Sequence, residues 1–180
     1  MTKPKPDWWV DLDQLITPFW QSLVDRLETA SPAYAHGIRR FSGWPKRLDR
    51  EIGWDEETGQ IWAGAQTAFY GPEPVPAPCP TDGYQRDHFV PWEGALRSGL
   101  VFASSKDRRR FFYYTQNIYI LDAHTNDEKS DKGPDEWRPA NENVWAQYAA
   151  LWTNIKHRWS LTATPAEKAA LIEMLRTDVR

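Results

Sequence analysis

Cysteine is nearly absent from this 180-residue sequence, in which Cys79 is the single example. One thiol cannot form an internal disulfide, and it excludes a metal cluster held by several thiolates. Long apolar runs are also missing: residues Met1–Pro6 are rich in lysine and proline, and no stretch is long enough for a signal peptide or a membrane span. We therefore expect a soluble, cytoplasmic protein with no membrane partner.

An excess of positive charge is missing too, since 22 Lys and Arg face 25 Asp and Glu, for a net charge of −3. Phosphate binding depends on counterion release from basic surfaces, so this balance argues against nucleic-acid binding by the protein as a whole. A single basic run is more often solvated surface than a binding site, but several runs together are compatible with a local basic face. These runs are Arg39-Arg40, Lys46-Arg47 with Arg50, Lys106 to Arg110, and Lys129 with Lys132.

Tryptophan and proline, by contrast, are prominent. Eleven tryptophans are far above ordinary usage, and we expect their rings to anchor the core. Apolar residues from 8 to 30 recur at helical spacing around Pro18, which predicts two short helices or one kinked helix. Gly71–Pro80 contains five prolines and predicts a connector. The sequence thus divides into an N-terminal helical or irregular extension with this connector, residues 1–80, and a second region, residues 81–180.

The second region predicts an α+β fold. Tyr84–Pro91 and Phe111–Leu121 have strand-like composition and would pair as a hairpin, followed by a short helix from about 123 to 132 that ends at Gly133-Pro134. A further strand is expected over Ile61–Tyr70. Helical spacing predicts a packing helix over 141–158, and Thr164-Pro165-Ala166-Glu167 combines a capping residue, a first-turn proline and a third-position glutamate, predicting a last helix to about 177.

The most informative feature is the pair Asp87-His88 at the end of the first of these strands, followed by Asn117 and Asn126. Asp87 offers an anionic oxygen and Asn126 a neutral one, a set that suits Mg²⁺ or Mn²⁺. His88 has the ordinary pKa of a base at cellular pH and would take a proton from water. Asn117 could orient the imidazole through its side chain or its carbonyl. These are the groups that hydrolysis of a phosphodiester requires.

The same residues resemble the HNH endonucleases, and more closely the branch with a GmrSD-like C-terminal nuclease domain. The likeness rests on Asp-His-Phe-Val-Pro from Asp87, Asn-Ile-Tyr-Ile-Leu from Asn117 and Asn-Asp-Glu-Lys-Ser-Asp-Lys-Gly-Pro-Asp-Glu-Trp-Arg-Pro from Asn126, and it covers about residues 84 to 178. It implies a ββα-metal core within a mainly helical domain, with Asn126 in place of the helix histidine found at many such sites.

The resemblance implies the following roles. Asp87 and Asn126 would hold one divalent cation, His88 would be the general base, and Asn117 would orient it. The implied activity is hydrolysis of DNA in restriction, defence or phage DNA processing. Nucleic-acid contacts are expected from Lys129, Lys132, Arg108, Arg109 and Arg110, with Lys129 on the scissile phosphate.

Other interpretations stay open from sequence alone. An isolated Asp-His pair is more often a turn cap beside a semi-buried imidazole, and asparagine is common at strand and helix ends. His124 is either an alternative ligand or a surface residue. The chain could also be a non-catalytic module that binds nucleic acid or protein, and the N-terminal helices could bind a protein partner or form a homodimer. A secreted nuclease toxin is disfavoured by the acidic net charge and the lack of an export segment.

Overall fold

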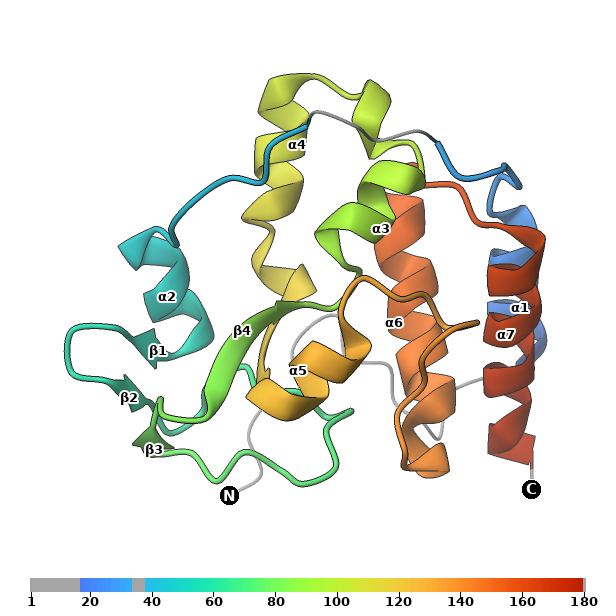
Figure 1. Ribbon diagram of the computed structural model, residues 1–180. Helices are drawn as coiled ribbons and strands as arrows, with labels where there is room; N and C mark the ends of the chain where they lie inside the picture. The colour runs from blue at the N-terminus through green and yellow to red at the C-terminus, as the bar shows by residue number, and fades with distance from the viewer. Residues whose placement is uncertain (1–16, 34–37, 180) are drawn as a thin grey trace.

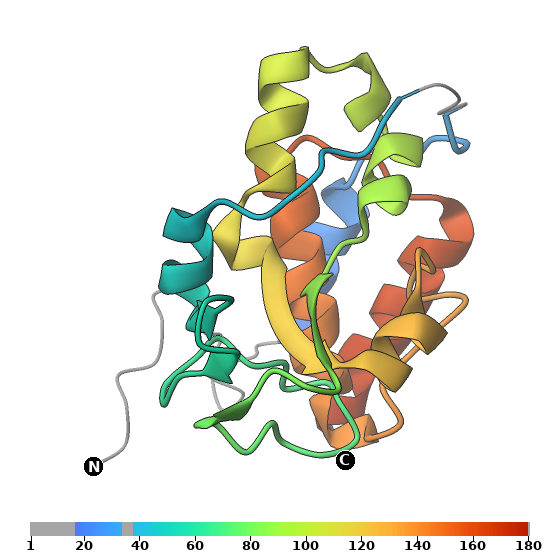
Figure 2. The same ribbon diagram turned by 60° about the vertical axis from the view of Figure 1, so that its left-hand side comes forward.

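The computed structural model describes residues 17–33 and 38–179, and within them it is a mixed α and β fold with two small sheets. This confirms the expected α+β class. Figures 1 and 2 show a strand pair and a short helix in front of a longer helix, with two further helices beyond it and a small sheet at the opposite side.

The strand pair and short helix form in the expected order. Strand β4 (Tyr84–His88) pairs antiparallel with β5 (Ile118–Asp122), with His88 opposite Ile118 and Tyr84 opposite Asp122. Helix α5 (Ala123–Lys129) begins directly after β5, because the Asp122 side chain accepts the amide of Thr125 at 2.8 Å and so satisfies the first turn. The predicted strand, strand, helix sequence is therefore present.

Two boundaries differ from the sequence prediction. Phe111 and Phe112 do not begin the second strand but end helix α4 (Ser105–Phe112), which starts where Ser104 accepts the Asp107 amide at 3.0 Å. A capping serine followed three residues later by an acid is a helix-start signal that overrides the strand-forming aromatics. The short helix also ends earlier than expected, at Lys129, because Ser130 takes a positive φ of 48°.

Between the two strands lies the short helix α3 (Trp92–Arg97), and the 3-10 turns η2 (Leu100–Phe102) and η3 (Thr115–Asn117) flank α4.

The C-terminal helices follow the predicted pattern. A 3-10 turn η4 (Glu142–Val144) leads into α6 (Trp145–Arg158), and α7 (Pro165–Leu175) is followed by η5 (Arg176–Val179). Thr164 accepts the amide of Glu167 at 3.1 Å, as the capping motif predicts. α6 packs against α7 and α1.

The N-terminal part supplies a helix to this packing and a small sheet beside the hairpin. Helix α1 (Thr17–Arg26) has Pro18 as its second residue, where a missing amide costs nothing; the helical prediction for 8–16 lies outside the described residues. Helix α2 (Lys46–Ile52) precedes a sheet of order β1-β2-β3. Its strands are β1 (Trp54–Asp55), β2 (Gln60–Ile61) and β3 (Cys79–Pro80).

The predicted strand over Ile61–Tyr70 is wrong beyond its first residue. The amides of Gln66 and Ala68 bond to the carbonyls of Ile52 and Ile120, so this segment makes one isolated β-bridge, from Thr67 to Ile120, and does not continue as a strand.

Strand β5 separates two clusters of buried side chains, because successive residues point to opposite faces. Ile118 and Ile120 pack with the small cluster around α2 and β1, whereas Tyr119 and Leu121 belong to the main core. That main core combines residues on both sides of position 80, among them Val24 of α1 with the C-terminal helices. None of the helices in the described ranges is long and apolar enough to cross a membrane.

Candidate functional site

Three of the four residues of the predicted site line one cavity of ≈ 420 Å³ where β4 ends and α5 and α3 meet it. They are Asp87, His88 and Asn126. Arg40 reaches the same cavity from the segment that precedes α2, and Glu93 and Asp127 add carboxylates to its wall. An acid, a histidine and an amide of the predicted site thus line the same cavity.

The spacing of the two elements explains this convergence. Gln85 and Asp87 are two apart on β4 and share a face, while Asn126 and Lys129 are three apart on α5 and share a face. Asn126 Nδ2 donates to Gln85 Oε1 at 2.6 Å, and Lys129 Nζ donates to Asp87 Oδ1 at 3.0 Å. Because the Asn126 nitrogen makes this contact, its Oδ1 is left without a hydrogen-bond partner among the described residues.

Asp87 is buried and held on both oxygens. The Tyr70 hydroxyl donates to Oδ2 at 2.6 Å, and Lys129, which is 0% exposed, also donates to the His88 carbonyl at 2.9 Å. Burial raises the pKa of Asp87, while the charge of Lys129 and the hydrogen bonds from Tyr70 and Lys129 oppose that shift. Burial lowers the pKa of Lys129, with Asp87 opposing. The two groups remain an ion pair, since their ordinary pKa values lie far apart and each charge stabilises the other.

This arrangement corrects the expected role of Lys129. An ammonium enclosed behind Asp87 cannot touch a scissile phosphate, so Lys129 positions the carboxylate and the strand end instead.

His88 points to the opposite face of β4 and is 3% exposed, in contact with the rings of Trp44 and Phe112. Its Nε2 lies 2.7 Å from the Phe112 carbonyl oxygen. A carbonyl only accepts, so this contact assigns the proton to Nε2 and leaves Nδ1 as an acceptor. Burial lowers the pKa of His88 to about 3; the Phe112 carbonyl opposes that shift, and the charges of Arg40 and Lys129 reinforce it. The imidazole is therefore neutral at physiological pH.

Asn117 does not orient the imidazole, so this part of the prediction is wrong. Its side chain accepts the Val90 amide at 2.8 Å and donates to the Val90 carbonyl at 3.0 Å, while its own carbonyl accepts the Phe89 amide at 2.8 Å. Asn117 is fully buried and fixes the backbone that follows His88. Its role is to hold the loop that follows β4.

The other basic residues expected to bind nucleic acid are not in this cavity. Arg108 donates to the carbonyls of Val101 and Ala103 and so ties α4 to the 3-10 turn that precedes it. Lys132 donates to the Glu128 carbonyl and lines a neighbouring cavity.

Arg109 and Arg110 are exposed and line a separate groove. His124 is largely exposed, lies 3.3 Å from Glu128 and does not line the cavity that holds His88. It is therefore a surface residue and not an alternative ligand.

Sequence reasoning missed Tyr70, Arg40 and the Phe112 carbonyl. Tyr70 and Arg40 lie far before the motif, and a backbone carbonyl leaves no trace in residue identity. Gln85 could have been found, because it lies two residues before Asp87 on a strand and therefore on the same face.

Asp87 and Asn126 are two oxygen donors that suit a divalent cation which keeps most of its waters. Within the part of the chain that the structure describes, no three His, Cys, Asp or Glu side chains converge on a metal position. Mg²⁺, however, commonly binds through one or two protein oxygens and keeps several waters. The Asp87 carboxylate retains lone pairs beyond its two hydrogen bonds, and Asn126 retains Oδ1.

Comparisons with known proteins are sparse. No family model matches the chain, and no solved structure matches it. The chain is similar to a protein of Arthroderma benhamiae described as an uncharacterized secreted protein, with 33% identity over 93 residues. The match covers 51% of this chain and 46% of that protein, so the chain matches less than half the length of that relative.

That relative overturns one expectation from the sequence. Its description as a secreted protein points to an extracellular location, and the predicted cytoplasmic location is therefore corrected. The prediction relied on the single cysteine and the lack of an apolar leader, and neither feature determines where a protein acts.

Proposed function

We propose that this protein is a metal-dependent endonuclease of the HNH type that hydrolyses phosphodiester bonds of DNA. The observation that carries the proposal is that Asp87, His88 and Asn126 line one cavity, with Asp87 and His88 on opposite faces of β4, within a strand, strand, helix unit. The resemblance of residues 84 to 178 to HNH nucleases supports the same activity. Because the similar protein is described as secreted, we place the proposed substrate outside the cell that makes the protein.

The proposed reaction uses His88 as the base. Nδ1 accepts a proton from water as the water oxygen bonds to phosphorus, and the bond from phosphorus to the 3′ oxygen breaks on the opposite side. The leaving 3′ oxygen takes a proton from solvent water, and His88 returns its proton to solvent. The Phe112 carbonyl holds the tautomer that makes Nδ1 the acceptor, and Asn117 fixes the backbone after His88. The products carry a 5′ phosphate and a 3′ hydroxyl.

The remaining residues act on charge and position. Tyr70 and Lys129 keep the Asp87 carboxylate in place, and Arg40 brings positive charge to the cavity mouth for phosphate. Asp87 and Asn126 would hold Mg²⁺ or Mn²⁺, which when bound neutralises charge on the phosphate as a Lewis acid.

The test is cleavage of supercoiled plasmid by the wild type and by His88→Ala, with Mg²⁺, Mn²⁺ or chelator. General-base catalysis contributes about 10²–10⁴-fold, so His88→Ala should slow nicking by at least two orders of magnitude. His124→Ala is the matched control, since it removes an exposed histidine of the neighbouring helix and should leave the rate unchanged. Circular dichroism and His88→Gln establish that the loss is chemical and not unfolding. Wild-type rates in His88→Ala, or in chelator, contradict the mechanism.

A non-catalytic binding module is the second candidate, and one observation favours it. Both Asp87 oxygens already accept hydrogen bonds, one of them from an ammonium that neutralises the carboxylate. Binding without cleavage of DNA or RNA in either metal would identify such a module.

A further inference from the structure

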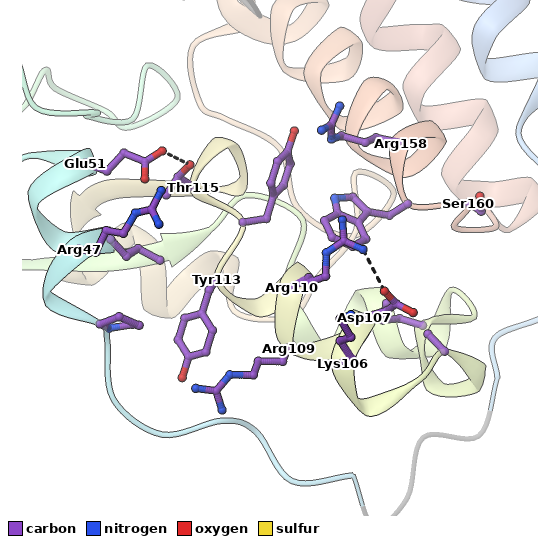
Figure 3. A pocket seen from close by; sticks show the side chains of 16 residues that line it. Arg47, Glu51, Lys106, Asp107, Arg109, Arg110, Tyr113, Thr115, Arg158 and Ser160 are labelled. Atoms are coloured by element: carbon purple, nitrogen blue, oxygen red, sulfur yellow. Dashed lines mark hydrogen bonds and ion pairs between the residues drawn. The ribbon is translucent and has the colours of Figure 1, made fainter.

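A second, larger hollow lies on the surface and, among the described residues, shares no lining residue with the His88 cavity. It is a groove of ≈ 1090 Å³ framed by helix α2, helix α4 and the C-terminal end of α6 (Figure 3). We call it the α2–α4–α6 groove. Five of its lining residues are cations and two are carboxylates; the cations are Arg47, Lys106, Arg109, Arg110 and Arg158.

Most of this positive charge is not neutralised within the protein. Arg110 pairs with Asp107 at 3.1 Å, and the other lining carboxylate, Glu51, accepts from the Thr115 hydroxyl at 2.7 Å (Figure 3). The remaining four cations have no ion-pair partner among the residues that the structure describes, and all four are exposed. A concave surface with one dominant sign of charge attracts an anion of the opposite sign.

Aromatic rings hold two of the guanidinium groups in place. Arg109 lies over the ring of Tyr113 at 5.3 Å, and Arg158 lies over the ring of Tyr114 at 5.2 Å. A guanidinium held against a ring loses less rotational freedom when it binds an anion, and its planar fork matches phosphate oxygens. Both rings line the groove, so aromatic surface accompanies the charge.

The groove also adjoins the candidate catalytic cavity. Trp44 contacts both the His88 ring, at 5.4 Å, and the Tyr113 ring of the groove, at 6.5 Å. Helix α4 supplies three cations to the groove and, through the carbonyl of Phe112 at its last residue, holds the His88 imidazole. A chain bound in one hollow is thus close to the other.

We propose that the α2–α4–α6 groove binds the sugar-phosphate backbone of a nucleic acid on the flank of the scissile bond. This inference rests on the proposed nuclease function, since the substrate is the same, but it assigns binding to residues outside the candidate catalytic cavity. The groove supplies sequence-independent affinity, because its cations meet phosphates and stacking on an aromatic ring tolerates any base.

The experiment separates binding from cleavage. Affinity for a short labelled DNA duplex is measured by fluorescence anisotropy, with chelator present, as a function of salt for the wild type and for Arg47→Ser with Arg158→Ser. Each phosphate contact contributes about one unit to the slope of log affinity against log salt, so the double variant should lower that slope by about two. Arg50→Ser with Arg176→Ser is the matched control, because both arginines are exposed and neither lines the groove.

Each outcome decides the proposal. A reduced slope and at least a tenfold weaker affinity in the groove variant, with an unchanged control, support it even if no cleavage is ever observed. Equal affinities in the two double variants overturn it, as does wild-type protein that binds neither duplex nor single-stranded DNA. Binding of a sulfated polysaccharide with the same dependence on Arg47 and Arg158, and no binding of DNA, overturns it in favour of another polyanion. Failure of His88→Ala to stop cleavage bears on the mechanism alone.

Discussion

The protein contains two buried lysine–carboxylate pairs with nearly the same construction. In one, Lys129 donates to Asp87 and to a backbone carbonyl, and Tyr70 donates to the other carboxylate oxygen. In the other, Lys156 donates to Glu167 at 2.7 Å and to a backbone carbonyl, and a tryptophan replaces the tyrosine. We call them the Asp87 pair and the Glu167 pair.

The two pairs differ in their surroundings. The Glu167 pair joins α6 to the first turn of α7, where the carboxylate also meets the positive end of the helix dipole. It borders a cavity of ≈ 480 Å³ that has no histidine among its lining residues. The Asp87 pair lies beside a neutral imidazole and the free oxygen of an amide. The same buried ion pair therefore serves helix packing in one place and holds a candidate ligand in the other.

The largest expected effect comes from removing each lysine. Lys129→Ala and Lys156→Ala both leave an uncompensated buried carboxylate, which costs about 3–5 kcal/mol in the free energy of unfolding. Addition of a divalent cation should distinguish the two variants. Mn²⁺ should raise the melting temperature of Lys129→Ala, because a cation at Asp87 replaces the lost charge, and it should not raise that of Lys156→Ala. Thermal unfolding with Mn²⁺ and with chelator measures both, and equal rescue of the two variants would show that Asp87 is not a metal ligand.

The next effect is destabilisation by acid through His88, which lies beside the Asp87 pair; no histidine is among the described residues that line the cavity beside the Glu167 pair. The pKa of His88 is about 3 in the folded state and about 6.5 when unfolded, so folding favours the neutral imidazole. The free energy of unfolding is therefore unaffected by His88 above pH 6.5 and falls as the pH falls toward 3. The loss is about 3 kcal/mol at pH 4. Urea unfolding at neutral and acid pH, in chelator, should show a smaller loss in His88→Asn than in the wild type.

His124→Ala should keep the wild-type pH dependence in that range, because His124 is exposed and does not touch the buried imidazole. A His88→Asn protein as acid-sensitive as the wild type would place the titrating group elsewhere.

Local periodicity explains which parts of the fold and site could be predicted. The strand spacing of Asp87 and the helix spacing of Asn126 bring them to one cavity without any long-range information. The four-residue capping motif that begins at Thr164 likewise predicts the start of α7. The features that depend only on residues nearby in the sequence can therefore be predicted from it.

Long-range packing determined the rest. Tyr70 reaches Asp87 across 17 residues, and the Phe112 carbonyl reaches His88 across 24. Lys129 reads as a surface lysine in sequence, and its burial follows from the position of α5 against β4. The aromatic run at 111–114 favours a strand by its composition, and the cap that makes Phe111 and Phe112 helical lies seven residues before Phe111, at Ser104.

A smaller effect is expected from the tyrosine that accompanies the Asp87 pair. Tyr70→Phe removes one hydrogen bond to a buried carboxylate and should cost about 1–3 kcal/mol. Tyr148→Phe is the control, because the Tyr148 hydroxyl is equally buried but has no hydrogen-bond partner among the described residues. Chemical denaturation compares the two. A loss in Tyr148→Phe as large as that in Tyr70→Phe would indicate that the contact with Asp87 contributes little.

The smallest effect on stability and the most specific effect on function belong to Asn126. Asn126→Ala removes a hydrogen bond at the surface and should change the free energy of unfolding by no more than about 0.5 kcal/mol. Gln85→Ala removes the same hydrogen bond from the other side and leaves Asn126 Oδ1 intact. If Oδ1 is a cation ligand, Asn126→Ala should require more Mg²⁺ or Mn²⁺ for half-maximal plasmid cleavage, and Gln85→Ala should shift that concentration much less. Identical metal titrations for the two variants would exclude Asn126 Oδ1 as a cation ligand, because this oxygen is present in Gln85→Ala and absent in Asn126→Ala.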